Sequence, residues 1–230
     1  MSRLTCLLFV LCSVLTPTLG CDWISRRFGH LSGLSLDLIQ HMGGPLTKQP
    51  SPVRFPDRLY SRVRKAEVES QLVFIRDSLD LISGLYHHDN LTSVTWNTKK
   101  LEDFQAIIHR QAEELSRCVS STSRRVDVKL RNCNRRLTRS ILDRTVMTGR
   151  RMKNKQKTNY KRQLRNYYRR LSCTLNRTGG SAASWELIRK ETKLNLDHLD
   201  VLVSFIKASG AASRRRNTPT QHQHQHVSSN

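Results

Sequence analysis

Residues 184–206 read SWELIRKETKLNLDHLDVLVSFI. Apolar and small side chains recur there every three or four positions, a spacing that places them on one side of a helix. The set is Trp185, Ile188, Thr192, Leu196, Leu199, Leu202 and Ile206. Gly179-Gly180 precedes the stretch, and either Ser181 or Ser184 can cap the helix. This is the most strongly patterned helix of the chain.

Four further helices are predicted upstream by the same periodicity. Their ranges are 22–42, 68–82, 101–118 with Asn97 or Thr98 as the cap, and 160–175. In the first of them, apolar residues recur at Ile24, Phe28, Leu31, Leu34, Leu38 and Met42. No segment alternates convincingly as a strand would. The predicted fold class is therefore all-α, a four-helix-bundle-type arrangement with five helices.

A long connection separates the first two helices. Gly43-Gly44-Pro45 ends the first helix, and Pro50, Pro52 and Pro56 follow within the next residues. Because proline removes a backbone donor and fixes φ, we expect no regular helix over 46–65 but a long ordered crossover. A crossover of this length permits the helices that it joins to run parallel.

The amino terminus has the pattern of a secretory signal peptide over residues 1–20. Arg3 precedes an apolar run from Leu4 to Leu15, and small residues stand before Cys21. The run is shorter than the roughly 20 residues needed to cross a bilayer. We therefore expect a secreted, extracellular protein that begins at Cys21, without membrane insertion. Export makes the sequons at Asn90 and Asn176 credible glycosylation sites.

The formal net charge of +22 is concentrated in one segment. Residues 124–157 hold thirteen basic residues against two acidic ones, a net charge of +11. This distribution is typical of a local basic insertion, so we expect no nucleic-acid partner. The insertion is compatible with a short helix near 135–147 or with disorder, and we expect it to be largely disordered, as we do the polar tail over 208–230, so that the domain covers 21–207. A solvated loop, an arm that binds heparan-type glycans and translated intron sequence are equally open interpretations.

Residues that would indicate an enzyme are not clustered. His109 and His198 stand alone on predicted helices, and His87-His88 lie in a connection without neighbouring ligand types. We expect no catalytic site, no metal site and no cofactor.

Five blocks in chain order carry a family resemblance. They are Cys21-Asp22-Trp23-Ile24, Ser93-Val94-Thr95-Trp96, Cys118-Val119-Ser120, Tyr167-Tyr168-Arg169-Arg170-Leu171 and Ala183-Ser184-Trp185-Glu186-Leu187-Ile188-Arg189-Lys190-Glu191-Thr192-Lys193. Together they resemble the type I interferon family, over about residues 21–123 and 157–207. The last block is the most specific. The absence of a cysteine from 43–66 and from the last block matches the fish-type, two-cysteine group.

The resemblance implies a disulfide from Cys21 to Cys118, which residue counting alone leaves as one of several pairings. Cys133 and Cys173 lie outside the family pattern. They are free to pair with each other, to stay reduced or to form intermolecular bonds.

The resemblance also implies a function. Family members bridge two different chains of a heterodimeric cell-surface receptor, which triggers JAK-STAT signalling and antiviral gene expression. The tighter site would include Arg189, Lys190 and Lys193 of the last helix, with Arg54, Phe55 and Arg58 of the crossover; the weaker site would include Arg165. Trp23 and Trp185 are expected in the core. The alternatives are another secreted helical cytokine, or a basic protein that binds heparin or anionic surfaces through 124–157.

Overall fold

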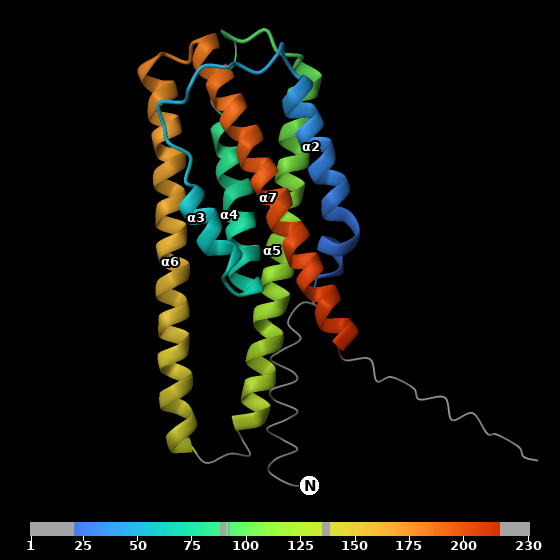
Figure 1. The fold of residues 1–230 in the computed structure, drawn as a ribbon, viewed down its shortest axis with the longest axis vertical. Coiled ribbons are helices and arrows are strands. Elements are labelled where there is room, and N and C mark those ends of the chain that lie inside the picture. Colours follow the sequence, from blue (N-terminus) through green and yellow to red (C-terminus); the bar gives the residue numbers. More distant parts are fainter. Residues whose placement is uncertain (1–20, 88–90, 92, 135–138, 217–230) are drawn as a thin grey trace, which may run out of the picture.

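The structure, a computed structural model, describes residues 21–87, 91, 93–134 and 139–216, with the backbone alone at 121–134, 139–154 and 211–216. This part of the chain contains six α-helices and one short π-helix, and it has no strand (Figure 1). The predicted all-α fold class is confirmed.

The first predicted helix begins with a π-helical turn. The π-helix η2 (Ile24–Phe28) continues directly into α2 (Gly29–His41). Phe28, Leu31, Ile39 and Met42 of this segment are buried, whereas Leu34 is 40% exposed. The prediction that Leu34 belongs to the buried side is therefore wrong: the buried series continues through Ser32, Ser35, Ile39 and Met42, and Leu34 lies outside it.

The crossover contains a short helix that the proline pattern argued against. Helix α3 (Asp57–Arg64) begins immediately after Pro56, and Leu59, Tyr60 and Val63 on it are buried. Proline is compatible with the start of a helix because the first turn has unbonded N–H groups in any case. The prolines therefore exclude a helix over 45–56 but permit one from Asp57 onward.

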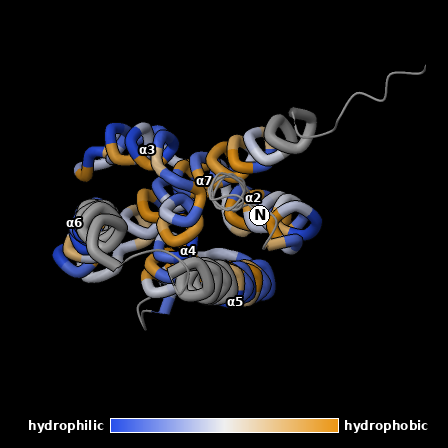
Figure 2. Tube along the Cα trace, turned by 90° about the horizontal axis from the view of Figure 1, so that it is seen from below, coloured by the Kyte–Doolittle hydropathy of each residue, from blue (hydrophilic) through white to orange (hydrophobic). Residues whose placement is uncertain are grey.

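The remaining helices are α4 (Val68–Leu85), α5 (Thr98–Asn134), α6 (Arg139–Arg177) and α7 (Ala182–Arg216). Helices α2 and α4 run in the same direction, α5 returns, and α6 and α7 form a final antiparallel pair (Figure 1). Seen along the bundle, α4 and α7 lie in the middle, with α2, α5, α6 and α3 around them (Figure 2). The long crossover makes the parallel pair possible, as the sequence predicts.

The helices of the structure extend past two predicted boundaries. The structure extends α5 to Asn134 and begins α6 at Arg139, so most of the basic segment 124–157 is helical where the sequence predicts disorder. These extensions project beyond the lower end of the other bundle helices (Figure 1). At the other end of the chain, α7 continues past residue 207 to Arg216. Residues 1–20 and 217–230, with the predicted signal peptide and most of the tail, lie outside the described residues.

A cluster of aromatic rings occupies the upper end of the core. Trp185 is completely buried, and its ring centroid lies 6.0 Å from that of Trp96 and 5.9 Å from that of Tyr86. Tyr86 also contacts Phe104 of α5 at 5.2 Å. Trp185 is thus a core residue, as predicted, and Trp23 is half-buried with its ring edge against Phe28.

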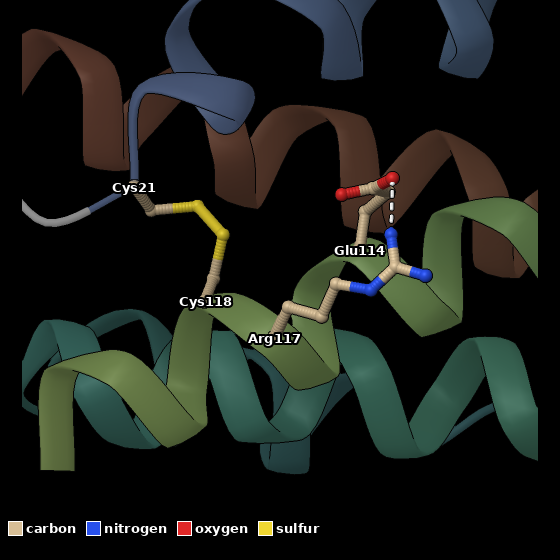
Figure 3. Close-up of a disulfide and its surroundings, with 4 residues drawn as sticks. All are labelled: Cys21, Glu114, Arg117 and Cys118. Carbon is tan, nitrogen blue, oxygen red and sulfur yellow. Dashed lines mark hydrogen bonds and ion pairs between the residues drawn. A yellow bond between two sulfur atoms is a disulfide. The ribbon is translucent and has the colours of Figure 1, made fainter. Parts of the chain in front are cut away.

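The predicted disulfide is present. Cys21 and Cys118 are bonded, with their Cα atoms 5.3 Å apart, and join the segment before η2 to α5 (Figure 3). The Arg117 guanidinium next to it forms an ion pair with Glu114 at 2.8 Å. Cys173 has a free, exposed thiol, and the side chain of Cys133 lies outside the described part.

Candidate functional site

Helices α2 and α7 together form the most apolar part of the described surface. The exposed large apolar side chains of that surface are Leu34 at 40%, Val201 at 57% and Phe205 at 46%. The two helices are antiparallel neighbours, because Gly43 approaches Arg189 at one end and Gly29 approaches Lys207 at the other. Val201 and Phe205 lie one turn apart on α7, and we call these two residues the apolar patch; Leu34 is a separate exposed residue on α2.

The crossover lies beside this patch and is held on α7. Lys190 donates from Nζ to the Gln49 carbonyl at 2.7 Å. The Phe55 ring lies 4.7 Å from the His198 ring on α7 and 5.9 Å from the Tyr167 ring on α6. Phe55 is therefore half-buried and mainly a packing residue, whereas Arg54 and Arg58 on either side of it are exposed.

Arg189 is not on the surface at all. Its side chain is 0% exposed, and its Nη2 donates to the Gly44 carbonyl at the start of the crossover. Its Nε lies 3.3 Å from Glu186 Oε2, and its Cζ lies 5.8 Å from the centroid of the Trp96 ring. The predicted receptor contact Arg189 is therefore not exposed in the structure, because its guanidinium is enclosed by the protein's own groups.

The surroundings of Arg189 form a clamp between three segments. Glu186 accepts from Trp96 Nε1 at 2.6 Å through Oε1 and pairs with Arg189 through Oε2. The Asn97 N–H, next to Trp96, donates to the Met42 carbonyl at 2.7 Å. Arg189 thus joins α7 to the end of α2 and to the start of α5. Within the described part of the chain, its buried Nε and Nη1 make no hydrogen bond, so ionic and cation–π contacts stabilise them.

The two lysines predicted for the same helix face are already engaged. Lys193 pairs with Asp197 at 2.8 Å, one turn along α7, and Lys190 contacts the crossover. Both are half-buried. They lie at the edge between α7 and solvent, where a partner can still reach them.

Arg165 lies on a different side of the molecule, on α6. It is exposed. Lys161, one turn before it on the same helix, pairs with Asp77 of α4 at 3.5 Å. Since residues four apart share a helix face, Arg165 lies on the side of α6 that is next to α4. The structure therefore separates Arg165 from the crossover and α7 residues.

A buried polar network connects α3, α6 and α7. Tyr60 Oη donates to Asn195 Oδ1 at 2.7 Å, Asn195 Nδ2 contacts Tyr167 Oη at 3.2 Å, and Tyr167 Oη donates to Glu191 Oε2 at 2.6 Å. Burial raises the pKa of Tyr60, and burial with the neighbouring Glu191 carboxylate raises the pKa of Tyr167. The network orders the core beneath the crossover.

The second predicted sequon is accessible. Asn176 is exposed near the end of α6, and the Thr178 hydroxyl donates to the Thr174 carbonyl at 3.1 Å. Asn90 lies outside the described residues.

Sequence reasoning missed the apolar patch. Val201 and Phe205 are four residues apart and out of phase with the buried series Leu199, Leu202 and Ile206. That off-phase apolar pair was the available signal, because a helix with one buried side has no packing reason to carry it.

An all-α bundle with a long first crossover and a disulfide from its amino terminus to α5 defines the class of helical cytokines. Among the described residues, no helix combines the length and the apolar character that crossing a membrane requires. The family model of the interferon alpha/beta domain matches residues 30–205. The chain belongs to the type I interferon family and is similar to its fish members.

Two relatives show this similarity. Interferon a3 of Oncorhynchus mykiss is 34% identical over 205 residues, which cover 89% of this chain and 97% of the relative. The solved structure of zebrafish interferon 1 superposes with a TM-score of 0.62 at 28% identity, covering 81% of this chain and 99% of that one. Interferons are secreted cytokines that bind cell-surface receptor chains, and they are not enzymes.

Proposed function

We propose that this chain bridges two different receptor chains on the cell surface and thereby triggers JAK-STAT signalling and antiviral gene expression. The ligand contributes geometry, because two separate surfaces hold the receptor chains close enough for their bound kinases to act. Family membership supports the receptor class. The alternative of a different secreted helical cytokine is excluded by that membership.

The tighter receptor chain docks on α2, the crossover and α7. The observation that carries this assignment is the apolar patch, since exposed large apolar side chains on a described surface mark interaction sites. Arg54 and Arg58 in the crossover and Lys190 and Lys193 on α7 add basic side chains to the same two segments. An apolar centre with a charged rim is the usual anatomy of a protein interface.

The weaker receptor chain docks across α4, α5 and α6, where Arg165 is exposed. The apolar patch and Arg165 lie on different helices, α7 for the former and α6 for the latter. Two receptor chains can therefore bind without competing for the same residues.

The experiment measures binding of residues 21–230 to each purified receptor ectodomain, together with phosphorylation of the downstream transcription factor in host cells. Phe205→Ser with Val201→Ser should weaken the tighter interaction by roughly 10- to 100-fold, the range for loss of central apolar contacts, and leave the weaker one unchanged. Arg165→Ala is the matched control: it should weaken the weaker interaction and leave the tighter one unchanged. Unchanged affinity of the Phe205→Ser, Val201→Ser variant for both ectodomains would contradict the assignment.

Heparan-type glycans are a second proposed partner. The sequence places their site in segment 124–157, whose helical extensions project from the bundle. Heparin binding that falls after deletion of this segment would support the assignment, and full retention would contradict it.

A further inference from the structure

Helix α6 has a strongly basic stretch within its described side chains. Between residues 155 and 177 it contains eight basic residues and no acidic residue. Among the described residues, the ion pairs of its basic side chains come from α4, where Glu69 pairs with Lys157 at 3.6 Å and Asp77 with Lys161 at 3.5 Å. The positive charge of the rest of the stretch is therefore not compensated by ion pairs among the described residues.

The contacts of α6 divide its surface into sides. Lys157 and Lys161 face α4, whereas Gln163 accepts a hydrogen bond from Arg62 of α3.

Arg170 lies seven residues, or two turns, after Gln163 and so points toward the α3 side. Arg162 and Arg169 are also two turns apart, on the outer side between these two contacts. Arg165, one turn before Arg169, lies at the border between this group and the α4 side and is left out of the group.

We call Arg62, Arg162, Arg169, Arg170 and Arg177 the outer arginine face. All five are exposed, and none forms an ion pair with a described carboxylate. Arg162 contacts only the Asn159 amide oxygen at 3.2 Å, and Arg62 binds the Gln163 amide and the Arg58 carbonyl. From Arg162 to Arg177 the face extends about 22 Å along the helix axis. It is thus a row of guanidinium groups that matches an elongated polyanion.

The chemistry of the face selects among polyanions. Single-stranded nucleic acid is bound by basic grooves that also offer aromatic rings for base stacking. The aromatic residues of α6 do not serve this purpose, because Tyr160, Tyr167 and Tyr168 are all buried. A membrane surface would need an exposed apolar side on the same helix, and the apolar side of α6 is packed in the core. Sulfate groups require only the guanidinium donors, which bind oxyanions through paired N–H groups.

We propose that the outer arginine face binds a linear sulfated glycan of the heparan type. This site is distinct from the basic segment 124–154, whose side chains are not described, and the proposal does not depend on receptor bridging. The face belongs to α6 and α3, on the opposite side of the bundle from α2 (Figure 2). A glycan bound there leaves α2 accessible.

The test compares three variants of residues 21–230 that each lose three positive charges. The face variant is Arg162→Gln, Arg169→Gln, Arg170→Gln; the surface control is Arg26→Gln, Arg27→Gln, Arg110→Gln, at exposed arginines elsewhere. The extension variant is Arg124→Gln, Arg125→Gln, Lys129→Gln. Binding to immobilised heparin is measured as a function of salt, with circular dichroism melting to confirm folding. The face variant should lose roughly tenfold in affinity near 0.15 M salt, and its log–log salt slope should fall by about two to three; the surface control should change little.

Several outcomes would overturn the proposal. Equal losses in the face variant and the surface control would mean that heparin responds to net charge alone. A loss confined to the extension variant would move the site to segment 124–157. The wild type is also tested with desulfated heparin, with a single-stranded oligonucleotide and with vesicles rich in anionic lipid. If one of these bound as tightly as heparin and its binding were lost in the face variant, the face would not select a sulfated glycan. Receptor binding by the face variant is a separate readout, so failure here leaves the proposed function untouched.

Discussion

Gly43 lies where the end of α2, the start of α5 and α7 meet, and it leaves no room for a side chain. A methyl group at this position would lie 2.6 Å from Trp96 Cδ1 and 2.9 Å from Trp96 Nε1, and it would also collide with the Arg189 guanidinium. Both neighbours are held in place, Trp96 by Glu186 and Arg189 by the Gly44 carbonyl. At this position glycine is required by the close approach of the backbone to two large side chains, not by its φ angle.

We predict that Gly43→Ala destabilises the protein by about 2 kcal/mol, the cost of forcing extra volume into a packed site. Gly33→Ala is the control, because a methyl group there meets nothing within 4 Å and alanine is the better helix former. Urea unfolding of the two variants measures the difference in the free energy of unfolding. If Gly43→Ala were as stable as Gly33→Ala, the clamp around Arg189 would be looser than the structure shows.

The disulfide is the element-scale constraint on the first helix. Cys21 precedes η2, and Cys118 lies on α5, 97 positions later in the chain. A cross-link that closes so long a loop stabilises by about 4 to 5 kcal/mol in the chain-entropy model, because it restricts the unfolded chain. It also fixes the entry to α2.

Replacing both partners, Cys21→Ser with Cys118→Ser, should lower the free energy of unfolding by about 2 to 5 kcal/mol. Cys173→Ser should have almost no effect, since that thiol is free and exposed. Guanidinium unfolding with and without reductant tests both statements, because reductant should destabilise the wild type and not the double variant. A similar loss in Cys173→Ser would show that this thiol has a structural role.

At the scale of the whole molecule, the tyrosines report on the integrity of the core. The chain has five tyrosines, and all of them are buried. Burial raises the pKa of Tyr60, Tyr86, Tyr167 and Tyr168. In the native state these phenols keep their protons above pH 10.0, the ordinary pKa of tyrosine, whereas the phenols of the unfolded chain lose theirs. Above this pH the native state therefore binds more protons than the unfolded chain does.

The native state should therefore be insensitive to tyrosine ionisation below about pH 10 and lose stability above it, by about 1.4 kcal/mol per pH unit for each such tyrosine. Tyrosinate absorbance should rise together with the loss of helical circular dichroism, as one transition. The chain in guanidinium is the control and should titrate near 10 without cooperativity. Ionisation of these tyrosines near pH 10 in a chain that remains helical would contradict their burial.

Residue periodicity by itself determined the fold class and the five main helices, because apolar side chains at helical spacing must be buried against one another. Family motifs added the disulfide between Cys21 and Cys118. Local patterns were insufficient in two places. At α3, the prolines argued against a helix, although a helix can begin directly after Pro56. Over 124–157, the charge density favoured disorder, but the structure continues α5 and α6.

The placement of functional side chains was decided only by the tertiary structure. Arg189 and Lys190 are adjacent in sequence, yet one is enclosed by Gly44, Trp96 and Glu186 and the other reaches the crossover at the surface. No local pattern distinguishes them, because the groups that bury Arg189 come from segments that are distant in the chain. The same reason applies to Leu34, Val201 and Phe205. Their exposure depends on how α2 and α7 pack, since a helix can bury only the side that its neighbours cover.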